Sequence, residues 1–437
     1  MDRIKPRWFA NNLNAAMRVL PVTVLTGARQ TGKTTLTRSL EPARSYFTLD
    51  DVGILDQAER NPDSLLSARP VILDEVQRAP QILLAVKRAV DSGRRAGDFI
   101  LTGSANLLLM KQVAETLAGR AIYLNLPPFC PTEWRERKDA LSPIDRLFAP
   151  DFEWREWPDE PGDWAAWLLR GGFPPALEID SEADRGLWFA AYVQTYLERD
   201  LRQLSAISSL PGFQRLMMLA AQRTGKLFNQ ADLARDAALS HPTAHRYVNL
   251  LETGCLITRL RPLATNPTAA LVKAPKLLWT DCGLAAWLAG IRSSADVAAR
   301  MDSVFWLEQT IFQTLETWRS LDPQRRKLHF WRNRTGHEVD FILEEAGKFV
   351  ALEIKASSQV SANDATGIRA FREDLKRKSA LVRGVVLHSG KARPLEEGIL
   401  ALPWGWLAQR DSCERYAKRR CYESRVAELQ SSAGHAG

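Results

Sequence analysis

The chain has 437 residues, of which 45% are hydrophobic and 25% are charged, and these proportions are those of an ordinary soluble globular protein. A chain of this length exceeds one ordinary core, so we expect two or three domains. The formal net charge of +8 only weakly favours an acidic partner such as DNA. No stretch approaches the roughly 18 apolar residues of a membrane span, and the first residues lack the apolar run of a signal peptide. We therefore expect a cytoplasmic protein with no membrane partner.

The cysteines argue against zinc and against disulfides. No pair has the C-x-x-C spacing of a zinc site. An odd count of cysteines suits reduced thiols in the cytosol better than a disulfide framework. The five are Cys130, Cys255, Cys282, Cys413 and Cys421.

Segment 22–37 predicts a phosphate-binding loop. A short β-branched run is followed by the pattern G-x-x-x-x-G-K-[ST], whose fixed positions are Gly27, Gly32, Lys33 and Thr34. Glycine lets the backbone turn so that successive N–H groups point at phosphate oxygens, and the following helix offers its positive end. Lys33 would add positive charge at the β and γ phosphates, and Thr34 would bind Mg²⁺. The predicted ATP-binding residues of this loop are Gly27, Ala28, Arg29, Gln30, Thr31, Gly32, Lys33, Thr34 and Thr35.

The apolar run 70–76 predicts a second strand, which ends in two acidic residues. Asp74 would be the outer partner of the Mg²⁺ ion, and Glu75 would orient and deprotonate the attacking water. The pairing of Asp74 with Glu75 therefore favours ATP hydrolysis over ATP binding alone.

Two further segments supply candidates for the same site. The run 98–106 predicts a buried strand that ends in small polar residues, where Thr102 or Ser104 could sense the γ phosphate. Arg120 follows a glycine and could be an arginine finger, in its own or in a neighbouring subunit. An ordinary surface arginine is the alternative, and the sequence leaves both open. The alternation of short strands with helices predicts that residues 1–132 form a parallel sheet covered on both faces.

The pattern changes in the middle of the chain. Residues 133–210 are expected to form an irregular connector and a helical linker, whereas 211–290 give short helices and a hairpin, the outline of a winged helix-turn-helix. Ser240 followed by Pro242 predicts the start of its second helix. DNA binding and a packing role without DNA are equally open, because Arg246 is the single Lys or Arg in that helix. The residues available to a DNA groove are Thr243, His245, Arg246 and Asn249.

Residues 295–405 predict a small α/β domain with a second group of charged side chains. Asp340 lies on the second of three strands, and Glu353 and Lys355 alternate on the third, so that all three can share one face of a sheet. Glu308 lies on the preceding helix. An incidental charged face is the alternative to a functional site. The remainder, 406–437, is expected to be a flexible basic tail.

The sequence resembles two known families. Several of its runs are similar to those of the predicted AAA-type ATPases of prokaryotes that carry a C-terminal nuclease-like domain of uncharacterised function. This resemblance covers most of the chain and implies ATP and Mg²⁺ for the first half, with no settled substrate. The similar runs are 27–35, 72–77, 100–104 and 117–120, with 170–174 and 196–201 similar to the linker of that family.

The C-terminal charges resemble the core of the PD-(D/E)xK nucleases. That resemblance implies a divalent metal ion held by Asp340 and Glu353, with Lys355 steadying the nucleophile or the pentavalent phosphate. Glu308 matches the acidic residue that often completes such a site.

Three functions are consistent with these features. The first is an ATPase, with Lys33, Thr34, Asp74 and Glu75 as its chemistry, whose nucleotide state moves a DNA-associated C-terminal half. The second is a metal-dependent nuclease gated by ATP. The third is a nucleotide-switched regulator or adaptor with an inactive nuclease-like domain. ATP is the expected ligand in each case, and DNA, another protein or a second copy of the chain are the expected candidates for a partner.

Overall fold

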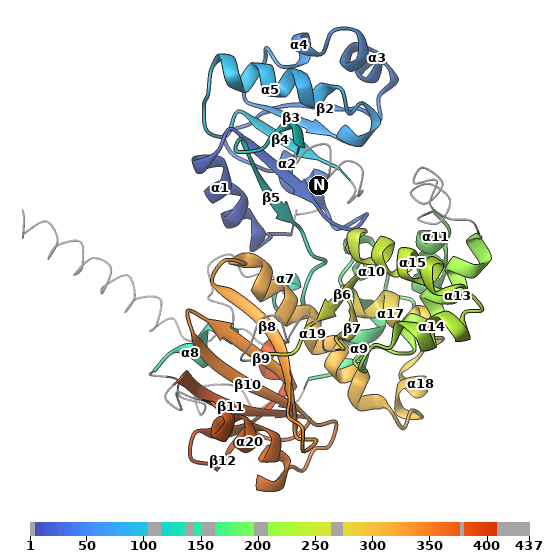
Figure 1. Ribbon diagram of the computed structural model, residues 1–437, viewed down its shortest axis with the longest axis vertical. Coiled ribbons are helices and arrows are strands. Elements are labelled where there is room, and N and C mark those ends of the chain that lie inside the picture. The colour runs from blue at the N-terminus through green and yellow to red at the C-terminus, as the bar shows by residue number, and fades with distance from the viewer. Residues whose placement is uncertain are drawn as a thin grey trace, which may run out of the picture.

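The structure is a computed structural model (Figure 1). It describes residues 5–103, 115–135, 143–150, 152, 162–195, 209–263, 274–375 and 380–408. Within these ranges, no helix combines the length and the apolar character that crossing a membrane requires. The described chain contains two larger sheets, one near each end of the sequence, and a helical region with a two-stranded sheet between them.

The first sheet is five-stranded and fully parallel, as the sequence predicts. Its strand order is β2-β3-β4-β1-β5, so that β1 lies between β4 and β5. β1, β3 and β4 are buried along their whole length, because helices cover both faces of the sheet. The strands are β1 (Val22–Thr26), β2 (Ser45–Thr48), β3 (Val71–Asp74), β4 (Phe99–Thr102) and β5 (Ala121–Asn125).

The helices of this first region divide between the two faces. One face is covered by α1 and α2, whose apolar residues, among them Phe9, Leu13 and Leu36, form one core. The other face is covered by α3, α4 and α5, which contribute to a second core. Their bounds are α1 (Phe9–Val19), α2 (Lys33–Arg38), α3 (Val52–Arg60), α4 (Pro62–Leu65) and α5 (Ile82–Ser92), with the short 3-10 helix η1 (Val76–Arg78) after β3.

The middle region is mostly helical and has a core of its own. The helix α15 begins where the sequence predicts: the Ser240 hydroxyl caps it by accepting a hydrogen bond from the Thr243 N–H, and Pro242 lies in its first turn. β6 and β7 pair antiparallel. The elements are α9 (Trp164–Arg170), α10 (Pro174–Leu177), α11 (Glu182–Thr195), α13 (Leu210–Ala221), α14 (Gln230–Asp236), α15 (His241–Thr253), β6 (Ile257–Leu260), β7 (Lys276–Trp279), α17 (Cys282–Leu288) and α18 (Ser294–Ala298).

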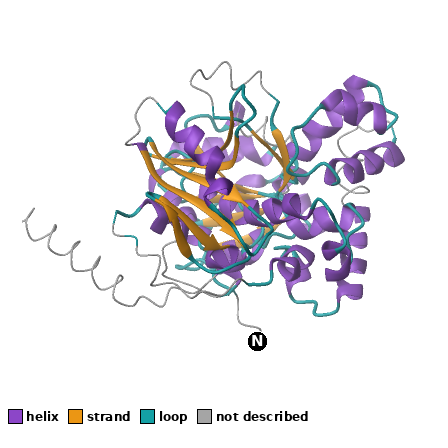
Figure 2. Cartoon of the chain, turned by 90° about the horizontal axis from the view of Figure 1, so that it is seen from below, coloured by secondary structure: helices purple, strands orange, loops and turns teal. Residues whose placement is uncertain are grey.

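The second large sheet is six-stranded and mixed, with the order β12-β13-β11-β10-β9-β8. The helices α8 and α19 pack on one of its faces and α20 packs on the other. In the view of Figure 2, from below, the strands of the chain overlap in projection and a large group of helices lies to one side of them. The elements are β8 (Arg326–Arg332), β9 (Glu338–Glu345), β10 (Lys348–Ile354), β11 (Leu381–His388), β12 (Arg393–Glu396), β13 (Ile399–Pro403), α7 (Pro131–Trp134), α8 (Pro143–Phe148), α19 (Ser303–Leu321), η4 (Ala362–Ala365), α20 (Thr366–Asp374) and η6 (Trp404–Ala408).

The structure corrects two predictions for the connecting segments. The segment predicted as an irregular connector contains α8, whose Ile144 and Leu147 are fully buried because they fill the core under the second sheet. The predicted tail begins later than residue 406, since Trp406 and Leu407 are buried in that same core. Residues 409–437 lie outside the described residues.

The regions that contain the two large sheets contact each other through helices and connecting segments. The Gln313 side chain on α19 donates a hydrogen bond to the Phe129 carbonyl at 2.6 Å. The Asn12 side chain on α1 donates to a carbonyl at the end of α19. The Thr132 hydroxyl donates to the Leu407 carbonyl near the end of the described chain. Residues that flank the N-terminal sheet, on α1 and after β5, therefore contact the C-terminal half directly.

Candidate functional site

The predicted phosphate loop joins β1 to α2 at the carboxyl end of the parallel sheet. Gly27 and Gly32 have φ values of +143° and +90°, which L side chains rarely adopt. A Cβ atom on Gly27 would also lie 2.5 Å from the Leu126 carbonyl oxygen. Both glycines of the motif are thus required by the backbone itself.

Lys33 lies across this loop. Its side chain is buried, and its ammonium group donates to the carbonyl oxygens of Gly27 and Ala28 at 3.1 and 2.8 Å. Burial lowers the pKa of Lys33 to about 8, and the negative charge of Glu75 is the largest of the opposing effects. A desolvated ammonium that is held by carbonyl dipoles gains from a bound phosphate, because the phosphate supplies full negative charge.

Asp74 ends β3 at the centre of a hydrogen-bonded group. The hydroxyls of Thr34 and Tyr46 donate to its Oδ2 at 2.8 and 2.7 Å. The Thr102 hydroxyl and the Glu75 N–H, the latter at 3.0 Å, donate to its Oδ1. The two predicted Mg²⁺ ligands, Thr34 and Asp74, are therefore in contact. Both offer oxygen atoms, which are the ligands that Mg²⁺ prefers. Thr102, a predicted sensor of the γ phosphate, directs its hydroxyl to this carboxylate.

Glu75 lies beside this group with a left-handed backbone, at φ +59°. A left-handed conformation is uncommon for a residue other than glycine, and such strain tends to occur at functional sites. Burial, and next the charge of Asp74, raise the pKa of Glu75 above its usual value. A raised pKa makes the carboxylate a better acceptor for the proton of an attacking water.

The rest of the loop is fixed by its own hydrogen bonds and by the N-terminal segment. The Thr31 hydroxyl donates to the Ala28 carbonyl at 3.1 Å. The Arg7 guanidinium donates to the Thr31 carbonyl at 2.8 Å. Gln30 has a left-handed φ of +59° between them. These hydrogen bonds fix the shape of the loop.

The sequence also predicts that Arg29, Thr35 and Ser104 contact the nucleotide, and the structure describes the first two. The charge of Arg29 acts on both Lys33 and Glu75, so that it lies near the predicted chemistry. Thr35 is exposed in the first turn of α2. Ser104 falls outside the described residues.

Arg120 lies at the end of the sheet where β1 and β5 begin, whereas the phosphate loop lies where β1 ends. The Arg120 carbonyl accepts a hydrogen bond from the Val22 N–H at 3.1 Å, at the start of β1. Its guanidinium donates to the Asp91 carboxylate at 2.7 Å and to the Ala118 carbonyl at 3.0 Å. The prediction that Arg120 acts on a nucleotide in its own subunit is therefore wrong, and a role in a neighbouring subunit stays a prediction.

Two residues of the middle region, Pro174 and Cys255, lie close to the phosphate loop. Pro174 Cγ lies 3.8 Å from the position that a Cβ on Gly32 would take. The Cys255 thiol, which follows α15, is near enough to Lys33 for the two groups to shift each other's pKa. Burial raises the pKa of Cys255 to about 11. The loop therefore lies at an interface within the chain.

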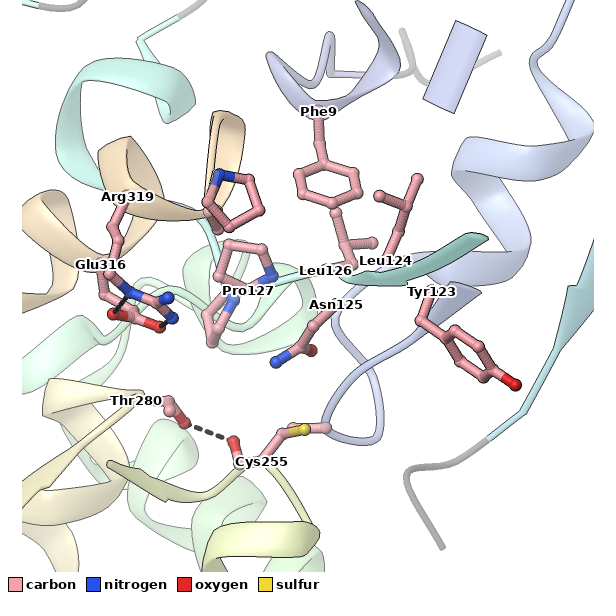
Figure 3. A pocket seen from close by; sticks show the side chains of 14 residues that line it. Phe9, Tyr123, Leu124, Asn125, Leu126, Pro127, Cys255, Thr280, Glu316 and Arg319 are labelled. Carbon is pink, nitrogen blue, oxygen red and sulfur yellow. Dashed lines mark hydrogen bonds and ion pairs between the residues drawn. The ribbon is translucent and has the colours of Figure 1, made fainter. Parts of the chain in front are cut away.

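A cavity of about 220 Å³ lies at this interface (Figure 3). It extends from Ala28 of the phosphate loop along the end of β5 to α19. Figure 3 shows the paired Glu316 and Arg319 at one side, with Phe9 at the upper edge. Cys255 closes it from below. The cavity thus combines apolar walls with a few polar groups, which is typical of small-molecule sites.

The charged residues predicted for the C-terminal half also lie together. The Asp340 carboxylate accepts a hydrogen bond from the Ile354 N–H at 2.8 Å, and Lys355 pairs with Glu353 Oε1 at 2.9 Å. Glu308 is buried on α19. Burial, and next the charge of Asp340, raise the pKa of Glu353 to about 8 and hold that of Glu308 well above its usual value.

Lys276, which no sequence motif indicates, lies among these carboxylates. Its Nζ is 2.7 Å from Glu338 Oε1 and 3.4 Å from both Glu308 Oε2 and Asp340 Oδ1. Although burial acts to lower it, the carboxylates raise the pKa of Lys276 above its usual value. In the part of the chain that the structure describes, no three Cys, His, Asp or Glu side chains are grouped so as to hold a metal ion.

The predicted DNA-facing side chains of α15 form a partly exposed polar surface. His245 and Arg246 are exposed, and Thr243 and Asn249 are half-buried. The Asn249 amide lies 3.0 Å from His245 Nε2, and its oxygen accepts from Arg259 on β6. Asn249 is thus bonded to both His245 and Arg259, and Arg259 adds a second guanidinium beside the helix.

Family models match the chain in three segments. Residues 20–134 match the model of an AAA domain. Residues 162–295 and 305–407 match two domains of unknown function, DUF8612 and DUF4143. The region that contains the parallel sheet and the phosphate loop is therefore the part of the chain that matches an AAA domain. Neither of the other descriptions names a winged helix or a nuclease, so both stay proposals.

Several proteins are similar to the chain. It is 29% identical over 405 residues to an uncharacterized protein of Mycobacterium tuberculosis, which covers 92% of this chain and 84% of the relative, and a protein of Mycobacterium bovis gives the same values. An uncharacterized protein of Haemophilus influenzae is 19% identical over 288 residues, or 64% of each chain.

Two solved structures also resemble it. A Walker-type ATPase of Pyrococcus abyssi has 17% identity and a TM-score of 0.38, over 65% of this chain and 96% of that one. A signal-transduction ATPase with a tetratricopeptide repeat sensor from Pyrococcus horikoshii has 12% identity and a TM-score of 0.26, over 73% and 48%.

Proposed function

We propose that the protein binds and hydrolyses ATP with Mg²⁺ at the phosphate loop, and that its nucleotide state acts on the C-terminal half. The observation that carries this proposal is the contact of Thr34 with Asp74 at 2.8 Å, beside a buried Lys33 and next to Glu75. These are the parts that phosphoryl transfer to water needs: a cation on the phosphates, ligands for Mg²⁺ and a base for the water.

Each residue then has a definite task. Thr34 and Asp74 would hold the Mg²⁺ ion, which neutralises charge on the phosphates. Lys33 exchanges the carbonyls of its own loop for phosphate oxygens. Glu75 accepts the proton of the attacking water, for which its raised pKa suits it.

The sheet order indicates where the rest of the nucleotide lies. Asp74 ends β3, and β4 and β1 separate β3 from β5. A triphosphate whose γ phosphate faces Asp74 across the loop thus directs its nucleoside toward β5. The cavity of about 220 Å³ lies on that side, with Phe9 and Pro127 as apolar walls and Asn125 as a polar group. Nucleotide in this cavity contacts both halves of the chain.

Substitution of Lys33 by alanine tests the proposal. The variant should lose nearly all ATP turnover, because the loop then lacks the ammonium group that Lys33 brings to the transferred phosphate. Lys87→Ala, a partly exposed lysine on α5 of the same domain, is the matched control and should hydrolyse ATP like the natural protein. Equal turnover in Lys33→Ala and in the natural protein, measured by phosphate release, would overturn the proposal.

The middle region is a winged helix in this proposal, and DNA is its partner. The exposed His245 and Arg246 of α15, with the neighbouring Arg259, support this role. Binding of a short fluorescent duplex, followed by anisotropy at several salt concentrations, tests it. Arg246→Ala should weaken binding and reduce the salt dependence. A duplex affinity that is the same in both proteins would contradict the DNA role.

A nucleotide-switched regulator or adaptor is the second candidate. Coverage of the phosphate loop by Pro174 and Cys255 favours it, since bound nucleotide would shift these contacts whether or not it is hydrolysed. The two candidates differ in turnover. A regulator would show negligible hydrolysis at saturating ATP, together with a partner whose binding depends on nucleotide.

A further inference from the structure

The C-terminal carboxylates can be tested against the metal ion that a PD-(D/E)xK nuclease requires. Such a site needs carboxylate oxygens that are open to a divalent cation. Asp340 is committed at both oxygens: Oδ2 accepts from the Ile354 N–H at 2.8 Å, and Oδ1 lies 3.4 Å from Lys276 Nζ. The Oε2 atom of Glu308 faces the same ammonium at 3.4 Å. The residues as arranged do not fit a shared divalent ion.

Lys276 takes up the place between the carboxylates. An ammonium group has three N–H donors, and three carboxylates surround this one: Glu338 at 2.7 Å, and Glu308 and Asp340 at 3.4 Å. The side chain is 3% exposed, so water competes little for these bonds. The Phe330 ring lies 5.6 Å from the ammonium and completes its enclosure. Full positive charge is thus already present where a nuclease would place its metal.

We propose that Lys276 is the resident cation of this cluster, so that the C-terminal domain takes no divalent metal there and is not a metal-dependent nuclease. The lysine reaches the cluster from another part of the fold. It opens β7, which pairs with β6, and β6 follows the Cys255 turn beside the phosphate loop. The cluster therefore ties the hairpin of the middle region to α19 and β9. Its role is to dock one module on another.

The balance of charge in the cluster predicts the effect of removing Lys276. The cluster holds four carboxylates, those of Glu308, Glu338, Asp340 and Glu353. Three cations face them: the ammonium groups of Lys276 and Lys355, and the Arg332 guanidinium 3.9 Å from Glu338 Oε2. Loss of Lys276 leaves the buried carboxylate of Glu308 and the partly buried carboxylates of Glu338 and Asp340 facing an open position. Oxygen ligands of this kind bind Mn²⁺ as they bind Mg²⁺. Lys276→Gln should therefore create a divalent site that the natural protein lacks.

Mn²⁺ titration of the nucleotide-free, full-length protein, followed by the electron paramagnetic resonance signal of free Mn²⁺, tests the proposal. The natural protein and Asp340→Asn should take up the same amount of Mn²⁺. Lys276→Gln should take up about one further ion per chain, and the double variant Lys276→Gln/Asp340→Asn should lose that gain. Lys327→Gln, in which an exposed lysine paired with Glu344 is changed, is the control and should gain none.

Two results would overturn the proposal. The first is Mn²⁺ binding by the natural protein that Asp340→Asn abolishes, or cleavage of plasmid DNA with Mn²⁺ that the same substitution abolishes. The second is a folded Lys276→Gln variant that gains no Mn²⁺. If Lys276→Gln fails to fold, the comparison of the natural protein with Asp340→Asn decides alone. No ATP enters these measurements, so their outcome is independent of whether Lys33 supports turnover.

Discussion

Two buried lysines lie beside acidic residues in this protein, one in each half, and their surroundings differ. Lys33 is bonded to two carbonyl oxygens, and burial lowers its pKa to about 8. Lys276 is surrounded by three carboxylates, which raise its pKa above the usual value. The first ammonium lacks a full counter-charge and gains one from a ligand. The second already has its counter-charges and belongs to the structure, so a lysine beside acidic residues does not by itself mark an active site.

Among variants that should still bind ATP, Glu75→Gln should give the largest loss of turnover. Turnover of ATP should fall by about 10²- to 10⁴-fold, since the amide cannot accept the proton of the attacking water. ATP binding should persist, because Lys33, Thr34 and Asp74 are unchanged. Phosphate release and equilibrium binding of a fluorescent ATP analogue measure the two quantities. Glu59→Gln, an exposed glutamate on α3, is the control. Undiminished turnover would show that Glu75 is not the base.

Lys276→Ala should give the largest effect on stability. Removal of one partner from a buried ion group leaves uncompensated charge, so the free energy of unfolding should fall by about 3 to 5 kcal/mol. Lys327→Ala, at an exposed pair with Glu344, should cost about 0 to 1 kcal/mol. Urea unfolding followed by tryptophan fluorescence gives both values. Similar losses in the two variants would remove the distinction drawn between Lys276 and an ordinary surface lysine.

The pH dependence of ATP binding should distinguish Lys33 from a permanently charged group. Its pKa of about 8 in the free protein lies below its ordinary value and rises when phosphate binds, so binding takes up a proton above pH 8. Affinity should therefore fall by up to about tenfold per pH unit above that value. Calorimetry in buffers of different ionisation enthalpy measures the uptake. Lys33→Arg, which stays protonated, should show none, and equal uptake in both proteins would contradict the assignment.

Arg120→Ala should have the smallest effect. Because Arg120 lies at the edge of the sheet away from the phosphate loop, turnover at low protein concentration should match that of Arg94→Ala, a neighbouring surface variant. A loss that appears only at high protein concentration would indicate that Arg120 acts on the site of a second copy. A loss at every concentration would contradict its placement.

The residues predicted for the nucleotide site lie together in the structure because each motif is local in the sequence. Gly27 to Thr34 form one loop after one strand, and Asp74 with Glu75 follow another, so motif spacing and strand pattern suffice to bring them to one edge of the sheet. Tyr46 is missed, since a tyrosine on an edge strand gives no sign of a bond to Asp74. Arg120 is misplaced because a glycine-arginine pair says nothing about which end of the sheet it occupies.

The sequence predicts only those residues of the C-terminal cluster that come from neighbouring elements. Glu308, Asp340, Glu353 and Lys355 follow from the order of one helix and adjacent strands, and the structure brings them together. Lys276 comes from a different sheet, and a lysine that opens an apolar strand is indistinguishable in sequence from a surface residue. Local sequence patterns do not predict contacts between segments that are distant in the chain.

The bond between the Thr132 hydroxyl and the Leu407 carbonyl has a consequence for biosynthesis. During translation the N-terminal domain leaves the ribosome long before residue 407 is made. Until then α7, which contains the buried Glu133, lacks the surface formed by η6. The N-terminal domain is thus completed by a contact with a residue that is made 275 positions after Thr132. A truncated product that stops before residue 404 should expose that unfinished surface to quality-control proteases.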